Sequence, residues 1–398
     1  MTRLPRRIAT PCFTAALAAS IAGATAGAGC SHPQWRNADA MRAGAPEPLG
    51  EDRLSLHWKF VTADRLTEID PQEFAGAAVY ADTLFIGSSS GWFFALRSST
   101  GAVRWRKKLG AVVSTPIVSG GMLLIGMADG TLLAADSQTG DVKWRYQSRG
   151  PIDQPPVVTG DVIVFANEAD QVVALDAITG KLKWQYKGET PEEYTLRGHA
   201  GVAIDNDLIY TGFSNGTLAA LRKDTGTIAW STSLKGEADR FVDVDATPIV
   251  VGDNVYASSS SGGVYSLDKA TGLIHWRVPF YDVAQPSATG NVGGLATDGK
   301  TLYVSVADLG TYAIDFGGNV VWRVGAKDGG EPAPPVVWNE LLLTALSRDG
   351  LFISDRRTGE TLEYFSPGEG FSAPPVVTGD GRLFVMSNRG IVYGFDLE

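Results

Sequence analysis

The sequence predicts an all-β fold, a β-propeller of about eight blades that each contain four antiparallel strands. Three observations support this prediction: a repeated segment that ends in tryptophan, a second repeated segment that precedes it, and a composition rich in turn residues. The 398 residues include 47 glycines and 20 prolines, and 44% are hydrophobic. Such a chain can bury a core and must turn often, which is typical of a fold built from many short strands.

The first repeated segment is clearest as ALDAITGKLKW at residues 174–184. Its Asp and Thr-Gly predict a tight turn, in which glycine supplies a positive φ. In the strand that follows, alternate side chains share a face, so we expect the tryptophan ring to fill the wedge between neighbouring blades. Six copies end in tryptophan and a seventh has glutamate in its place: Trp105, Trp144, Trp184, Trp230, Trp276, Trp322 and Glu363.

The second repeated segment pairs a short Val/Ile run, a turn and another β-rich run, which predicts a hairpin. Together the two segments make a unit of four strands. The last hairpin and strand, at 376–396, lack a fourth strand, and the strand from Leu54 to Val61 lacks the other three. We therefore expect the N-terminal strand to complete the last blade, giving seven internal repeats and one composite blade. A seven-bladed ring is the alternative, and it would require one irregular repeat.

Residues 1–29 are predicted to be a signal peptide, because a basic start precedes an apolar, alanine-rich stretch and a run of small residues. Cys30 then becomes the first residue of the mature chain and the predicted lipidation site. Gly27 stands where a lipoprotein signal usually has a larger aliphatic residue, so cleavage without lipidation is the alternative. We expect 30–54 to be the lipidated cysteine and a flexible tether, and 55–398 to be the propeller.

The composition argues against several classes of function. A formal net charge of −10 and the lack of a basic stripe argue against nucleic acid as a partner. The four histidines are widely separated and lack metal-ligand spacing, so we predict no metal site. Acidic residues such as Asp136 and Asp176 recur at one slot of the repeat, which the blade itself explains. We predict no catalytic residue, no cofactor and no enzymatic activity.

The spacing between successive tryptophans singles out three adjacent blades. It is 39 residues from Trp105 to Trp144, 40 to Trp184, and then 46 in each of the next three repeats. The additional residues fall mainly in the links at 187–200, 233–246 and 279–291, which a propeller places on one face. Adjacent long links are typical of a binding surface. Links that merely vary in length, with solvated charges, are the alternative interpretation.

The D-x-x-T-G-x-x-x-W unit resembles the repeat of pyrroloquinoline-quinone-like propellers across nearly all of residues 55–396. Within that superfamily, an exported lipoprotein with a single propeller resembles the BamB family, accessory lipoproteins of the outer-membrane β-barrel assembly machinery. Two stretches carry the closer match: Leu196-Arg197-Gly198, and Asp239-Arg240 followed by Asp243-Val244-Asp245 and Thr247-Pro248. His199 departs from the family pattern, which has an acidic residue at that point.

The resemblance implies a non-enzymatic scaffold, lipid-anchored on the periplasmic face of the outer membrane, that binds the POTRA domains of BamA. It implies that Leu196, Arg197, Asp243 and Asp245 are partner-binding residues, with Tyr194 at a position where the family more often has an aliphatic residue. Tyr194 and Arg240 complete the predicted set as aromatic and arginine anchors in the long links. One alternative is a propeller lipoprotein that serves another envelope complex. The other is a quinone-dependent dehydrogenase, although most of those enzymes have an adjacent cysteine pair and the mature chain would have one cysteine.

Overall fold

The computed structural model describes residues 53–62, 68, 71–189, 199–235, 243–259, 262–280, 292–325 and 330–398. The predicted signal peptide, Cys30 and the tether lie outside the described residues, as do four of the predicted partner-binding residues. Those four are Tyr194, Leu196, Arg197 and Arg240. In the part of the chain that is described, no helix is long and apolar enough to cross a membrane.

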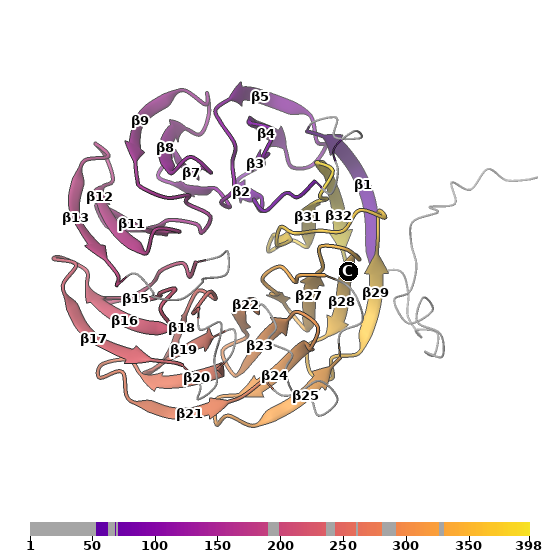
Figure 1. The fold of residues 1–398 in the computed structure, drawn as a ribbon. Coiled ribbons are helices and arrows are strands. Elements are labelled where there is room, and N and C mark those ends of the chain that lie inside the picture. The colour runs from indigo at the N-terminus through magenta and orange to yellow at the C-terminus, as the bar shows by residue number, and fades with distance from the viewer. Residues whose placement is uncertain are drawn as a thin grey trace, which may run out of the picture. The chain divides into compact units, whose positions relative to one another are not determined.

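The described residues form eight four-stranded antiparallel sheets, which follow one another around a ring as the blades of a propeller (Figure 1). The first four blades are built from consecutive strands. Blade 1 has β2 (Ala78–Tyr80), β3 (Thr83–Gly87), β4 (Trp92–Arg97) and β5 (Val103–Lys108). Blade 2 has β6 (Ile117–Ser119), β7 (Met122–Gly126), β8 (Thr131–Asp136) and β9 (Val142–Gln147). Blade 3 has β10 (Val157–Thr159), β11 (Val162–Asn167), β12 (Gln171–Asp176) and β13 (Leu182–Lys187). Blade 4 has β14 (Ala203–Asp205), β15 (Leu208–Gly212), β16 (Thr217–Arg222) and β17 (Ile228–Ser233).

The remaining blades complete the ring. Blade 5 has β18 (Ile249–Val251), β19 (Asn254–Ser259), β20 (Gly263–Asp268) and β21 (Ile274–Val278). Blade 6 has β22 (Val292–Thr297), β23 (Thr301–Val306), β24 (Gly310–Asp315) and β25 (Val320–Val324). Blade 7 has β26 (Val336–Trp338), β27 (Leu341–Ala345), β28 (Leu351–Asp355) and β29 (Thr361–Phe365). Blade 8 combines β30 (Val376–Val377), β31 (Arg382–Met386) and β32 (Ile391–Leu397) with the N-terminal strand β1 (Leu54–Val61). The predicted fold, with eight blades and a composite last blade, is confirmed.

Burial along each blade follows from its position between two neighbours. The second and third strands are covered on both faces, so their sequences are almost continuously apolar, as in VIVFAN of β11 and QVVAL of β12. The outer strands have one face in solvent and therefore alternate. In LKWQYK of β13, Trp184 and Tyr186 are partly buried while Gln185 between them is exposed.

The tryptophans join consecutive blades as the repeat pattern predicts. Six indole Nε1 groups donate a hydrogen bond of 2.8–3.2 Å to a backbone carbonyl in the turn between the third and fourth strands of the next blade. The donors are Trp58, Trp105, Trp184, Trp230, Trp276 and Trp322. The ring also covers the glycine of that turn: a Cβ on Gly226 would lie 2.4 Å from Trp184 Cε3. Glycine is therefore required in this turn for two reasons: the backbone has a positive φ, and the tryptophan ring leaves no room for a Cβ atom.

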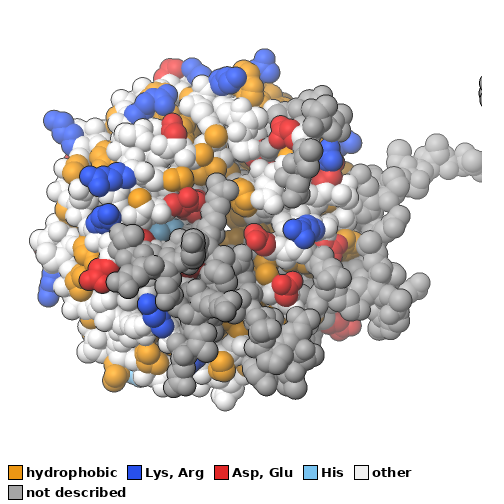
Figure 2. Space-filling model, in the orientation of Figure 1, with side chains coloured by type: hydrophobic (Ala, Val, Ile, Leu, Met, Phe, Trp, Pro, Cys, Tyr) orange, Lys and Arg blue, Asp and Glu red, His pale blue; other side chains and the backbone are white. Residues whose placement is uncertain are grey.

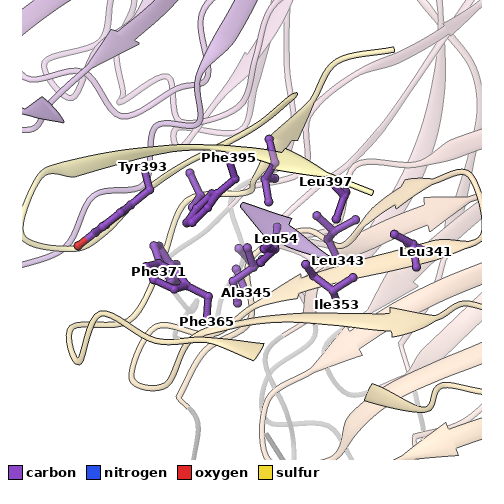
Figure 3. Close-up of a cluster of buried hydrophobic side chains, with 14 residues drawn as sticks. Leu54, Leu341, Leu343, Ala345, Ile353, Phe365, Phe371, Tyr393, Phe395 and Leu397 are labelled. Atoms are coloured by element: carbon purple, nitrogen blue, oxygen red, sulfur yellow. The ribbon is translucent and has the colours of Figure 1, made fainter. Parts of the chain in front are cut away.

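The composite blade closes the ring through seven β1–β32 residue pairs, from Leu54 opposite Leu397 to Val61 opposite Ile391. Beside this pairing lies a buried cluster between blades 7 and 8, in which Leu54, Leu397 and Phe395 face Leu343 and Ile353 (Figure 3). Burial of each such side chain contributes about 1.5–3 kcal/mol. The two ends of the propeller are thus held together without a covalent bond.

Glu363 has a structural reason to replace tryptophan in blade 7. A tryptophan there would need a carbonyl from a turn between the third and fourth strands of blade 8. That blade has no such turn, because β32 ends at Leu397 and the fourth strand comes from the other end of the chain. Instead, a Glu363 Oε2 atom accepts a hydrogen bond of 3.0 Å from the backbone N–H of Arg53, immediately before β1.

Candidate functional site

The links between blades and the turns between second and third strands lie at the same end of the strands, because the four strands of a blade alternate in direction. The three long links follow β13, β17 and β21, which belong to blades 3, 4 and 5. On the face visible in Figure 2, Lys and Arg side chains are interspersed with acidic ones and do not gather in one basic stripe. The candidate site is described below from the residues at the ends of the first two long links, which the structure describes.

A group of buried and half-buried ionisable residues lies where blades 3, 4 and 5 meet, and we call it the His199 cluster. Its members are Asp153, Asp170, His199, Asp243 and Asp245. His199 ends the first long link, and Asp243 and Asp245 end the second. The exposed fractions of His199, Asp170 and Asp243 are 3%, 7% and 1%. The cluster thus underlies the two links that the sequence predicts to bind a partner.

Both ring nitrogens of His199 have acceptors. Nδ1 lies 2.8 Å from the carbonyl oxygen of Ala200, and Nε2 lies 3.2 Å from Asp170 Oδ1. A carbonyl oxygen can only accept, so Nδ1 carries a hydrogen, and Nε2 donates to Asp170 when the ring is protonated. The Phe213 ring meets the imidazole edge to face, with centroids 6.2 Å apart.

The Asp170 carboxylate joins two blades. Its Oδ1 atom accepts a hydrogen bond of 2.9 Å from the backbone N–H of Ser214, and its Oδ2 atom accepts one from the Ser214 hydroxyl. Ser214 lies in the turn between β15 and β16 of blade 4, whereas Asp170 lies in the corresponding turn of blade 3. Asp170 therefore bonds to both that turn of blade 4 and the end of the first long link.

The pair has pKa values that favour opposite charges. Burial alone would lower the pKa of His199, but the hydrogen bonds to Asp170 and Ala200 and the nearby carboxylates outweigh it and raise the pKa. Burial would raise the pKa of Asp170, but its hydrogen bonds from His199 and Ser214 outweigh that effect and lower the pKa. Both shifts favour the imidazolium–carboxylate form of the pair.

In the other carboxyls of the cluster, hydrogen bonds and nearby positive charge do not outweigh the effect of burial on the pKa. Burial, together with the charge of Glu168, raises the pKa of Asp153 to about 6, against the opposing effect of His199. Burial and the neighbouring Asp243 raise the pKa of Asp245 to about 7. The Oδ1 atom of Asp153 is buried without a hydrogen-bond partner among the described residues. Among the described residues, Asp170 is therefore the carboxyl of the cluster that is hydrogen-bonded to the His199 ring.

Asp170 occupies a backbone position that is a glycine with positive φ in four other blades. The equivalent residues in blades 1, 2, 4 and 8 are Gly91, Gly130, Gly216 and Gly390. Asp170 has a φ of 54°, in the left-handed region. A non-glycine residue there costs on the order of 1 kcal/mol. The hydrogen bonds of its carboxylate to His199 and Ser214 offset that cost.

The structure brings together two of the six predicted partner-binding residues. Asp243 is buried and Asp245 is partly exposed, and both lie beside His199 and Asp153. In the sequence, His199 stood out only as a departure from a family pattern, and Asp153 and Asp170 were missed. A comparison of the turns would have revealed Asp170 as an aspartate where blades 1, 2, 4 and 8 have glycine. The participation of all six residues in partner binding stays a prediction.

The described residues contain no group of three or more His, Cys, Asp or Glu side chains arranged to hold a metal ion. In the His199 cluster, the imidazole nitrogens are already engaged by Ala200 and Asp170. The chemistry that this arrangement supports is recognition through charge and hydrogen bonds at the base of two links.

Comparison with known proteins agrees with the fold. A BamB from Moraxella catarrhalis superposes with a TM-score of 0.71 at 22% identity, covering 86% of this chain and 100% of that one. Quinohemoprotein alcohol dehydrogenase from Comamonas testosteroni superposes with a TM-score of 0.69 at 15% identity, covering 87% of this chain and 76% of that one. At these identities the similarity establishes the propeller fold alone.

Sequence comparison is more specific. Outer membrane protein assembly factor BamB of Kangiella koreensis is 39% identical over 61 residues, a stretch that spans 14% of this chain and 16% of that protein. The sequence pattern of the family described as outer membrane protein assembly factor BamB matches residues 53–154 and 139–315. Because these two matches together cover more than half of the chain, the protein belongs to the BamB family of outer membrane protein assembly factors.

Proposed function

We propose that this protein is a scaffold of the machinery that assembles β-barrel proteins in the outer membrane. In this proposal it is exported to the periplasm, attached to the outer membrane through lipid on Cys30, and bound to the POTRA domains of BamA. Membership of the BamB family is the observation that carries the proposal. The protein acts by binding and performs no catalysis.

The links after β13 and β17 are the proposed docking surface. They belong to adjacent blades, leave the ring on the same face and return beside the His199 cluster. The sequence places Tyr194, Leu196 and Arg197 in the first link and Arg240 in the second. Aromatic and arginine side chains contribute disproportionately to protein interfaces, and leucine adds apolar contact area here.

Co-purification from solubilised envelopes tests the partner. We expect the barrel-assembly components to be recovered with the tagged wild-type protein, and the double variant Arg197→Ala/Arg240→Ala to lose them. Lys181→Ala is a matched control, because Lys181 is an exposed cation in the turn between β12 and β13, at the opposite end of the blade. The proposal fails if barrel-assembly components are absent from the wild-type sample, or if the double variant retains them as well as the control does.

Two other results would redirect the assignment. Recovery of a different envelope complex would make the protein a scaffold of that complex. Calcium-dependent dye reduction after addition of pyrroloquinoline quinone would contradict the non-enzymatic proposal, since that activity belongs to quinone-dependent dehydrogenases.

A further inference from the structure

Each of the first two long links is held at both ends by one turn. The backbone N–H of Gly188, at the start of the first link, donates to the carbonyl oxygen of Asp170 at 2.8 Å. At the end of the same link, His199 bonds to the Asp170 carboxylate. Asp170 therefore holds the departing chain with its backbone and the returning chain with its side chain.

The second link is held in the same way by the turn between β15 and β16. The N–H of Leu234, at its start, donates to the carbonyl oxygen of Gly216 at 2.8 Å, and the N–H of Val244, at its end, donates to Phe213 at 3.3 Å. Ser214 lies within that turn and donates two hydrogen bonds to Asp170. The Asp170 carboxylate thus connects the two turns that hold the ends of the first and second links.

The hydrogen bond and the ion pair between His199 and Asp170 both depend on the proton at Nε2 of His199. Three carboxyl groups interact with His199: Asp170 from the turn between β11 and β12, Asp153 from the segment before β10, and Asp245 from the segment before β18. Glu168 and Asp243 are the neighbours of Asp153 and Asp245. All are acidic. If the ring loses its proton, Nδ1 keeps its hydrogen bond to Ala200, while Nε2 can no longer donate to Asp170. The buried carboxylates then lose their counter-charge.

We propose that the protonated His199 and Asp170 form a clasp that positions the two partner-binding links, and that loss of the His199 proton loosens the clasp and weakens partner binding. This inference rests on the proposed function for its partner. Asp170 and His199 are positioning residues in it, since they act through the links that they hold. Asp170 keeps a left-handed backbone where four other blades have glycine, which is consistent with this role.

The test measures binding of the purified POTRA domains of BamA to the full propeller between pH 5.5 and 8.5. We expect the wild-type affinity to fall by about five- to tenfold as the pH rises, a range typical of coupling between two sites. His199→Gln retains an amide that donates to Asp170 but does not titrate, so its affinity is expected to vary less with pH. Parallel pH profiles for the wild type and His199→Gln would overturn the inference.

Asp170→Gly provides a second variant that should fold, because four other blades have a glycine with positive φ at the same position. It keeps the backbone carbonyl that holds Gly188 and removes the carboxylate. We expect it to bind at least fivefold more weakly at low pH while remaining folded at the temperature of the assay. Wild-type affinity in Asp170→Gly would overturn the clasp.

A readout without the partner separates this inference from the proposed function. Tryptic cleavage within the two links, normalised at each pH to a small peptide substrate, is expected to rise with pH in the wild type and to be fast throughout in Asp170→Gly. If the wild type binds no POTRA domain at any pH but shows this cleavage pattern, the proposed function fails and the clasp stands. If cleavage is equal in the two proteins at every pH, the clasp is wrong.

Discussion

The indole Nε1 of Trp184 in blade 3 donates a hydrogen bond to the carbonyl oxygen of Lys223 in blade 4, at a distance of 2.8 Å. The bond crosses the boundary between two sheets that share no strand, so it joins blades that backbone pairing leaves separate. The same relationship recurs at five other boundaries. Blade 2 differs, because the buried Nε1 of Trp144 has no hydrogen-bond partner among the described residues.

This difference gives the first prediction. Trp184→Phe and Trp144→Phe lose similar ring contacts, but only the first loses a hydrogen bond. We expect Trp184→Phe to lower the free energy of unfolding by about 1 kcal/mol more than Trp144→Phe, the usual net contribution of one hydrogen bond. Urea denaturation of the two variants measures the difference. Equal losses would show that the tryptophans contribute by packing alone.

The second prediction concerns the glycines beneath the tryptophans. Gly226 and Gly120 both have positive φ, 70° and 55°, so a Cβ strains the backbone at either position. At Gly226 it would also lie 2.4 Å from Trp184 Cε3, whereas at Gly120 it would meet nothing within 4 Å. Gly226→Ala should therefore cost about 1–3 kcal/mol more than Gly120→Ala. A comparable loss in both variants would contradict the close approach of the ring.

The third prediction concerns closure of the ring at Glu363. Glu363→Ala removes the acceptor of the Arg53 N–H, while Glu363→Gln keeps a carbonyl oxygen in its place. We expect the alanine variant to lose about 1–2 kcal/mol and the glutamine variant to lose less. Hydrogen exchange should accelerate in β1 of the alanine variant before it accelerates in blades 2 to 5. Uniform acceleration over all blades would argue that Glu363 has no local role in holding β1.

The fourth prediction is a stability that decreases as the pH rises above about 4. Burial raises the pKa of Asp153 to about 6 and of Asp245 to about 7, so folding favours their protonated forms. The raised pKa of His199 acts in the same direction: its contribution is complete below the usual histidine pKa and is lost as the pH rises through the folded value. Carboxyls with a lowered pKa, such as Asp170, lose their contribution only in more acidic solution.

Thermal unfolding at constant ionic strength measures this dependence. We expect the unfolding midpoint to be higher at pH 5 than at pH 8 by about 3 °C or more, and Asp245→Asn to reduce the difference. Asp136→Asn is a control for loss of an aspartate, because Asp136 ends β8 outside the cluster and accepts hydrogen bonds from the exposed turn that follows. A higher midpoint at pH 8 than at pH 5 in the wild type would contradict the buried carboxyls.

The fifth prediction concerns attachment to the membrane. Cys30→Ser should leave the propeller intact and release the protein into the periplasmic fraction, because the variant lacks the sulfur that carries the lipid. Mass spectrometry of the wild type should show a diacylated and N-acylated Cys30. An unmodified mature N-terminus would favour the alternative that the signal peptide is cleaved without lipidation.

The ring could be predicted in detail because its information is local and repeated. Each unit encodes its own turn at Thr-Gly and its own outer strand around a tryptophan, so comparing units reveals both the blades and the boundaries between them. The composite blade followed from counting strands at the two ends of the chain. Even the departure at Glu363 was visible, although its reason, a blade without the usual turn, required the three-dimensional arrangement.

The candidate site was only partly predictable, because its contacts join different units. Asp170 and His199 are 29 residues apart and belong to neighbouring blades, and Asp243 comes from a third. Spacing located the long links correctly, but it could not reveal that Asp243 is buried or that an aspartate in a glycine position reaches His199. Repetition along the chain therefore determined the propeller, whereas the charged cluster was decided by packing between blades, which places side chains from distant repeats within hydrogen-bonding distance.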